Sequence, residues 1–133
     1  MTTLSYPWTE VWQRLAALFE DIAAQVEQCV PGVTHVMSHH HNPAFPFWAY
    51  ISFRKTDADS IDISVSCKRA GDKLLISADI AHECGLIIAD YPEQQIDLHA
   101  PSFDAALFAA FHAIEQYLRQ QLDLICNEVS ALA

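Results

Sequence analysis

Two stretches of the chain carry apolar residues at the three- and four-residue spacing of one α-helical face. The first predicted helix covers about residues 7–30, because Pro7 suits a first helical position and Pro31-Gly32 ends the pattern. The second covers about residues 102–130 and has Ser102 in the N-cap position. The two apolar faces consist of Trp8, Val11, Leu15, Leu18, Phe19, Ile22, Val26 and Cys29, and of Phe103, Leu107, Phe111, Ile114, Leu118, Leu122, Ile125 and Val129.

The middle of the chain changes to an alternation of apolar and polar positions, which indicates strands with one buried face. The connection at residues 70–72 predicts a tight hairpin, and Ile96 and Leu98 extend the last strand if it continues past Pro92. Residues 31–46, with three prolines and a run of histidines, are expected to form a loop. The predicted strands cover about residues 47–54, 61–68, 73–82 and 86–91.

This order of elements predicts one α+β domain over residues 1–133. Short connections favour pairing of consecutive strands, so we expect a three- to four-stranded antiparallel meander. Each helix has an apolar face to bury, and one face of the sheet can cover both. The expected architecture is therefore a two-layer sandwich, with the N-terminal and C-terminal helices on the same sheet face.

Charge narrows the classes of partner. The formal net charge is −10, and such a protein lacks the Lys and Arg excess with which proteins bind nucleic acid or anionic membranes. No apolar run reaches the roughly 18 residues of a membrane-spanning helix, and no secretory signal begins the sequence, so a cytoplasmic location is expected. Bases gather at Arg54, Lys55, Lys68, Arg69 and Lys73, and acids at Asp90, Glu93, Asp97 and Asp104.

The cysteines favour packing over chemistry. Cys29, Cys67, Cys84 and Cys126 are far apart in the sequence and form no CxxC pair, so zinc-ribbon and redox motifs are absent. Cys29 and Cys126 fall on the apolar helix faces and Cys67 on the apolar side of a strand, where a thiol acts as a small hydrophobic group. Only Cys84, in a predicted turn, has no packing explanation.

The sheet face that the helices leave uncovered is the main candidate for binding. If Phe47, Ile51 and the other apolar positions of the alternation face the helices, the opposite face of the sheet presents Trp48, Tyr50, Arg54 and Lys68 among small polar residues. Aromatic and Arg side chains among small polar ones are typical of protein interfaces. We therefore predict Trp48, Tyr50, Arg54 and Lys68 as partner-binding residues, with an ordinary solvated sheet face as the alternative interpretation.

A histidine cluster raises the question of a metal. His39 and His41 project to one side of an extended chain and His40 to the other, so His39 and His41 could share a divalent transition metal. His82 is the further ligand of this hypothesis. The spacing matches no known zinc motif, so the favoured interpretation is a solvated loop, and no cofactor is required.

No catalytic motif supports an enzyme. The turn His82-Glu83-Cys84-Gly85 places an imidazole near a thiol, but the neighbouring acid opposes thiolate formation. With three glycines in the chain, neither a GxGxxG nor a Walker A loop can be written. We expect no catalytic activity and assign no catalytic residue.

In size, acidity and order of elements the chain resembles small bacterial secretion chaperones and toxin-neutralising immunity proteins. The resemblance implies a small acidic protein-binding module that docks a protein partner or forms a homodimer. Two alternatives stay open. One is a metal-binding protein or metal-dependent enzyme that uses the His39–His41 cluster, and the other is a small-ligand binder with a pocket between helices and sheet.

Overall fold

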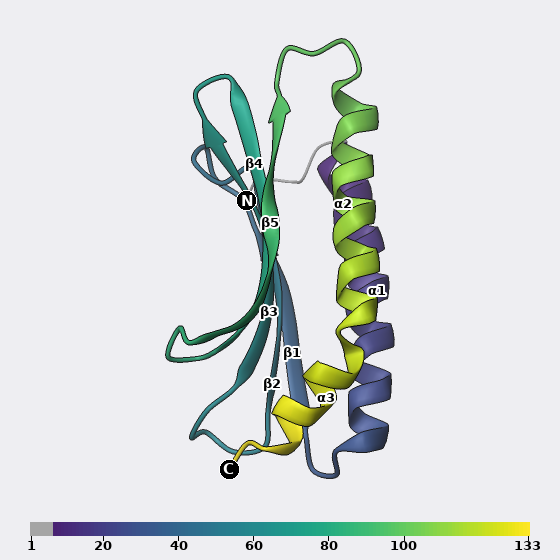
Figure 1. Cartoon of the computed structure of the whole chain (residues 1–133), viewed down its shortest axis with the longest axis vertical. Helices are drawn as coiled ribbons and strands as arrows, with labels where there is room; N and C mark the ends of the chain where they lie inside the picture. Colours follow the sequence, from purple (N-terminus) through teal and green to yellow (C-terminus); the bar gives the residue numbers. More distant parts are fainter. Residues whose placement is uncertain (1–6) are drawn as a thin grey trace.

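The computed structural model describes residues 7–133 and confirms an α+β fold in two layers (Figure 1). One layer is an antiparallel sheet, and the other consists of three helices that lie on one face of that sheet. The elements are α1 (Trp8–Cys29), β1 (Thr34–His40), β2 (Phe47–Arg54), β3 (Ile61–Ala70), β4 (Lys73–His82), β5 (Ile87–Asp97), α2 (Phe103–Gln120) and α3 (Leu122–Ser130).

The sheet has five strands in the order β1-β2-β3-β4-β5, one more than the three to four predicted. Each strand pairs with its neighbour in sequence, as the short connections predict. Strand β5 continues past Pro92 to Asp97, and Ile96 is buried. Pro92 is tolerated because β5 is an edge strand and the β4–β5 pairing is irregular near this position.

The additional strand β1 corrects the prediction that residues 31–46 form a loop. His35, Met37 and His39 alternate with the outward Thr34, Val36, Ser38 and His40, and all seven residues pair with β2. The prolines that suggested a loop lie on either side of this strand and not within it. A strand at a sheet edge needs only one neighbour, so polar side chains are accommodated on β1.

The helices divide the covered face of the sheet between them. Helix α1 packs on β1 and β2, α2 on β4 and β5, and α3 on β3. The core between the layers includes an aromatic group in which Phe47 stacks on Trp8 at 5.8 Å between ring centroids and meets Phe111 edge-on at 6.0 Å. Among the described residues, no helix combines the length and apolar character needed to cross a membrane.

The predicted second helix is interrupted. Helix α2 ends at Gln120, and α3 begins at Leu122 and turns toward the sheet near the C-terminus (Figure 1). The apolar spacing continues through the interruption because α3 buries Ile125 and Val129 in the same core, so the pattern predicts one helix. The Lys55 ammonium holds the end of the chain by donating a 2.6 Å hydrogen bond to the Ser130 carbonyl.

Two of the cysteine interpretations are settled by burial. Cys67 is fully buried, and burial raises its thiol pKa to about 12, which confirms a packing role. Cys29 is exposed, which corrects the prediction that it packs on the apolar face of the first helix. The next residue, Val30, takes the buried position at the end of α1.

Candidate functional site

The helices leave one side of the sheet uncovered, and we call this side the open face. The ends of its central strands lie farther from the helices than their middles, so the face is concave (Figure 1). The open face comprises Thr34, Val36, Ser38 and His40 of β1, Trp48, Tyr50, Ser52 and Arg54 of β2, Asp62, Ser64, Ser66 and Lys68 of β3, Leu75, Ser77, Asp79 and Ala81 of β4, and Asp90 and Gln95 of β5.

Three aromatic side chains meet on the open face, and we call them the aromatic cluster. The ring centroids of Trp48 and Tyr50 are 5.8 Å apart, and His40 lies 5.2 Å from Trp48 and 6.1 Å from Tyr50. His40 reaches this group because it pairs directly with Trp48 across β1 and β2. Trp48 is 40% exposed although it is a large apolar side chain. The cluster therefore offers aromatic surface that nothing in the described part of the chain covers.

The two basic residues predicted for partner binding lie at opposite ends of the open face. Lys68 is exposed and follows Cys67, which pairs with Phe47 next to the aromatic cluster. Arg54 lies at the far end of β2, where its guanidinium is 3.5 Å from the Glu83 carboxylate. The structure thus places Lys68 on the Trp48 side of the aromatic cluster and Arg54 beyond Tyr50 at the other end of β2.

Several hydroxyl groups on and beside the open face are paired with one another or with a carboxylate. Ser52 and Ser60 donate hydrogen bonds of 2.6 and 2.8 Å to the Asp62 carboxylate. The hydroxyls of Ser66 and Ser77 lie 3.1 Å apart across β3 and β4. Ser52, Ser66 and Ser77 thus form a surface of small side chains beside the aromatic cluster, and we call it the serine surface.

Three aspartates, Asp62, Asp79 and Asp90, form an acidic group on the same face. Asp79 is directly opposite Asp90 across β4 and β5. Burial raises the pKa of the Asp79 carboxyl, and the charges of Asp90 and Asp62 raise it further. Like charges directly opposite one another on a sheet destabilise it. This group was not predicted from the sequence, because it depends on the β4–β5 register.

This acidic group predicts the effect of Asp79→Asn on stability. The pKa of the Asp79 carboxyl is higher in the folded protein than in the unfolded chain. The protein therefore loses stability as the pH rises from the unfolded pKa through the folded one, and the loss persists at neutral pH. The amide cannot ionise, so we expect the variant to be about 0.2–1 kcal/mol more stable at neutral pH. Urea denaturation measures the difference. It should disappear at a pH low enough to protonate Asp79.

Asp57→Asn is the matched control, because Asp57 is exposed in the β2–β3 loop. Its unfolding midpoint should stay close to that of the wild type. If Asp79→Asn were less stable than the wild type at neutral pH, the acidic group would not be the source of strain that the geometry indicates.

The three predicted metal ligands are not brought together. His39 packs against Trp12 at 4.6 Å on the helix side of β1, and His82 lies at the opposite end of β4. His39 pairs with Ala49, which pairs with Val65 of β3, whereas His82 pairs with Ile61 of β3. Val65 and Ile61 are about 13 Å apart along that strand. Within residues 7–133 no three His, Cys, Asp or Glu side chains form a group that could hold a metal ion.

His39 and His41 nevertheless share an unusual feature. His39 Nδ1 and His41 Nε2 are buried atoms without a hydrogen-bond partner in the described part of the chain. Burial lowers the pKa of His39, and the charges of His41 and His40 lower it further. The lowered pKa favours the neutral form of the His39 imidazole, which is the form that binds metals.

His82 has structural partners instead. Its Nδ1 lies 2.8 Å from the Asp59 carboxylate, and its Nε2 lies 3.9 Å from Glu128 of α3. The hydrogen bond from His82 lowers the pKa of the Asp59 carboxyl. Cys84 is exposed in the adjacent turn. His82 therefore links the end of β4 to the β2–β3 loop and to α3.

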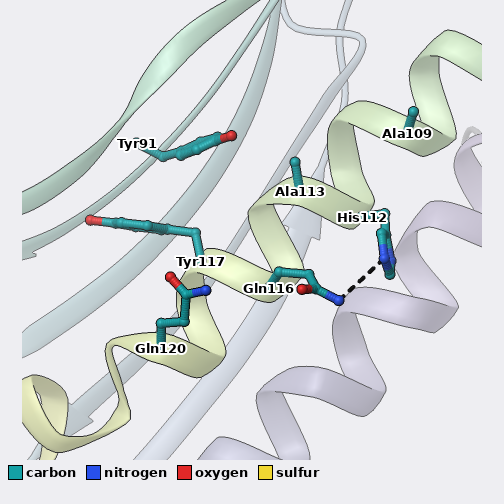
Figure 2. Close-up of a pocket in the computed structure, with 7 residues that line it drawn as sticks. All are labelled: Tyr91, Ala109, His112, Ala113, Gln116, Tyr117 and Gln120. Carbon is teal, nitrogen blue, oxygen red and sulfur yellow. Dashed lines mark hydrogen bonds between the residues drawn. The ribbon is translucent and has the colours of Figure 1, made fainter.

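A cavity of about 430 Å³ lies between α2 and the edge strand β5 (Figure 2). The rings of Tyr91 and Tyr117 lie 5.1 Å apart, tilted by 35°, on one side of it, and the amide of Gln116 donates a 3.3 Å hydrogen bond to His112 on the other (Figure 2). Burial raises the pKa of the Tyr117 hydroxyl, so the hydroxyl stays protonated. Apart from Tyr91, its lining residues all belong to α2, and its side chains form no nucleophile and base pair.

Comparisons with known protein families, with curated proteins and with solved structures found no match for this chain. The function is therefore inferred from the open face and from the other groups described above.

Proposed function

We propose that this protein is a non-catalytic binding module whose open face docks a basic segment of a protein partner. The single observation that carries the proposal is the exposed aromatic cluster of His40, Trp48 and Tyr50 on the concave face, beside the acidic group. Aromatic rings attract Lys and Arg side chains through cation–π contacts, and carboxylates attract them through charge. A segment rich in Arg or Lys can make cation–π contacts with the aromatic cluster and ion pairs with the acidic group.

The paired hydroxyls of the open face also favour docking. Burying a polar group without a hydrogen-bond partner costs free energy. The hydroxyls of Ser52, Ser66 and Ser77 already have partners on the face itself. A partner can therefore cover the serine surface without leaving those hydroxyls unpaired.

Charge favours a basic partner over a second copy of the chain. A twofold contact whose axis passes near Asp79 would place the acidic group of one copy near that of the other. Two chains with a net charge of −10 each also repel one another at low salt. The homodimer stays an alternative outcome of the experiment.

Peptides of opposite charge test the proposal. An arginine-rich peptide should bind the protein, and a glutamate-rich peptide of equal length should not. Binding should weaken as salt is added, because salt screens exposed charges over about 8–10 Å at physiological ionic strength. Fluorescence anisotropy of labelled peptides measures both. Equal binding of the two peptides would contradict the proposal, and a dimer that binds neither would favour self-association.

A second candidate function, metal binding, is favoured by the buried and unpartnered nitrogens of His39 and His41. In this hypothesis the two imidazoles and solvent hold a divalent transition metal, without His82. This hypothesis is tested by metal analysis of untagged protein that is purified without a nickel column. Stoichiometric metal that is lost in a His39→Ala, His41→Ala variant supports metal binding, and metal-free wild-type protein that takes up no added Zn²⁺ rejects it.

A further inference from the structure

Two cysteines from distant parts of the sequence meet at the end of the helical layer. Cys29 is the last residue of α1, and Cys126 lies in α3. The two helices pack against each other there. Both cysteines line the same cavity of about 460 Å³, together with Gln25, Leu122, Asp123, Asn127 and Ser130.

The two thiols lie close enough to interact, because both line this cavity and the Cys29 thiol contributes to the raised pKa of the Cys126 thiol. Burial raises the pKa of the Cys126 thiol to about 11, and Cys29 and the charge of Asp123 contribute to the rise. Cys29 is exposed, whereas Cys126 is half-buried. Cys29 is therefore the more accessible thiol of the pair.

The other cysteines have different surroundings. Cys67 is fully buried in the sheet, and Cys84 is exposed in the β4–β5 turn. Neither lines the cavity that Cys29 and Cys126 share. Cys84 is thus a natural comparison, since it is exposed like Cys29 but lies outside the pair.

We propose that Cys29 and Cys126 form a dithiol modification site that a low-molecular-weight disulfide oxidises to an intramolecular disulfide bond. The Cys29 thiolate attacks one sulfur of the small disulfide, which forms a mixed disulfide and releases one thiolate. Cys126 then loses its proton to solvent, and its sulfur attacks the Cys29 sulfur and releases the second thiolate. The protein loses two electrons and two protons, and the small disulfide becomes two thiols.

The bond would link the end of α1 to α3. These elements are far apart in the sequence, so the cross-link closes a long loop and restricts the unfolded chain. The oxidised protein should therefore unfold at a higher urea concentration than the reduced protein. The site is independent of the open face, which lies on the other side of the sheet.

The experiment uses the full chain with Cys84→Ser, equilibrated with mixtures of reduced and oxidised glutathione. Peptide mapping after alkylation quantifies the bond between Cys29 and Cys126, which lowers the mass by two hydrogen atoms. The measurement is made in buffer and in concentrated urea. Because the fold holds the two thiols in one cavity, their effective concentration should be at least about tenfold higher in the native protein.

Single variants separate the two steps. Cys126→Ser should stop at a mixed disulfide with glutathione on Cys29, and Cys29→Ser should leave Cys126 unmodified in the folded protein. An effective concentration in the native protein that is no higher than in urea would overturn the proposal. So would glutathione that stays on Cys29 while Cys126 remains free for alkylation.

Discussion

A variant with Trp48→Ala and Tyr50→Ala is expected to bind an arginine-rich peptide at least about 30-fold more weakly than the wild type, a loss of about 2 kcal/mol. Trp48 and Tyr50 supply two of the three rings of the aromatic cluster. Rigid aromatic side chains bury a large area at little entropic cost, so they dominate interfaces in which they are central. Titration followed by fluorescence anisotropy measures the change in Kd.

Leu86→Ala is the matched control. Leu86 is 64% exposed in the β4–β5 turn, so its removal takes away a similar kind of surface at a place outside the aromatic cluster. Its Kd should stay within about threefold of the wild type, as for contacts outside a hot spot. Circular dichroism should show that both variants are folded. A folded double variant with wild-type affinity would remove the aromatic cluster from the proposed interface.

The largest effect on stability is expected from Phe47→Ala. Phe47 is fully buried and contacts both Trp8 of α1 and Phe111 of α2, so it joins the sheet to two helices. Truncating a buried Phe costs about 3–5 kcal/mol through lost burial and the cavity left behind. A domain of this size is stable by only about 5–15 kcal/mol, so the variant loses a large part of its stability.

Urea denaturation followed by circular dichroism measures this loss. Phe45→Ala is the control, because Phe45 is 38% exposed in the β1–β2 loop, two residues before Phe47. Its effect should stay within about 1 kcal/mol. Equal midpoints for Phe47→Ala and the wild type would contradict the packing that joins the two layers.

Local patterns were sufficient to predict most of the fold. The alternation in residues 61–68 and the spacing in residues 7–30 depend on a single buried face, and apart from the exposed Cys29 these two elements bury the face that their pattern predicts. The same alternation placed Trp48 and Tyr50 on the open face. The buried residues of an element can thus be predicted from the sequence where one of its faces is exposed to solvent and the other is buried.

Contacts between distant residues were not predictable in this way. The aromatic cluster needs His40, whose position depends on the pairing of β1 with β2, and the acidic group needs the pairing of Asp79 with Asp90. A one-residue change of register would move every side chain of a strand to the other face. For β1, the alternation of His35, Met37 and His39 was the available signal, and the neighbouring prolines obscured it.

The helical layer illustrates the same limit. The apolar spacing continues through Gln121 because α3 follows α2 into the same core, so the change of direction leaves no trace in the pattern. That change of direction accompanies the packing of α3 against α1 and the meeting of Cys29 and Cys126. The spacing of cysteines along the sequence gave no hint of this pair.

The most direct test of the central claim uses the three tryptophans of the chain as reporters. Trp48 lies on the open face, whereas Trp8 and Trp12 belong to α1 and pack toward the core. In a ¹⁵N-labelled protein titrated with the arginine-rich peptide, the indole N–H signal of Trp48 should shift while those of Trp8 and Trp12 stay in place. Shifts at Trp8 or Trp12 with an unchanged Trp48 signal would contradict docking on the open face.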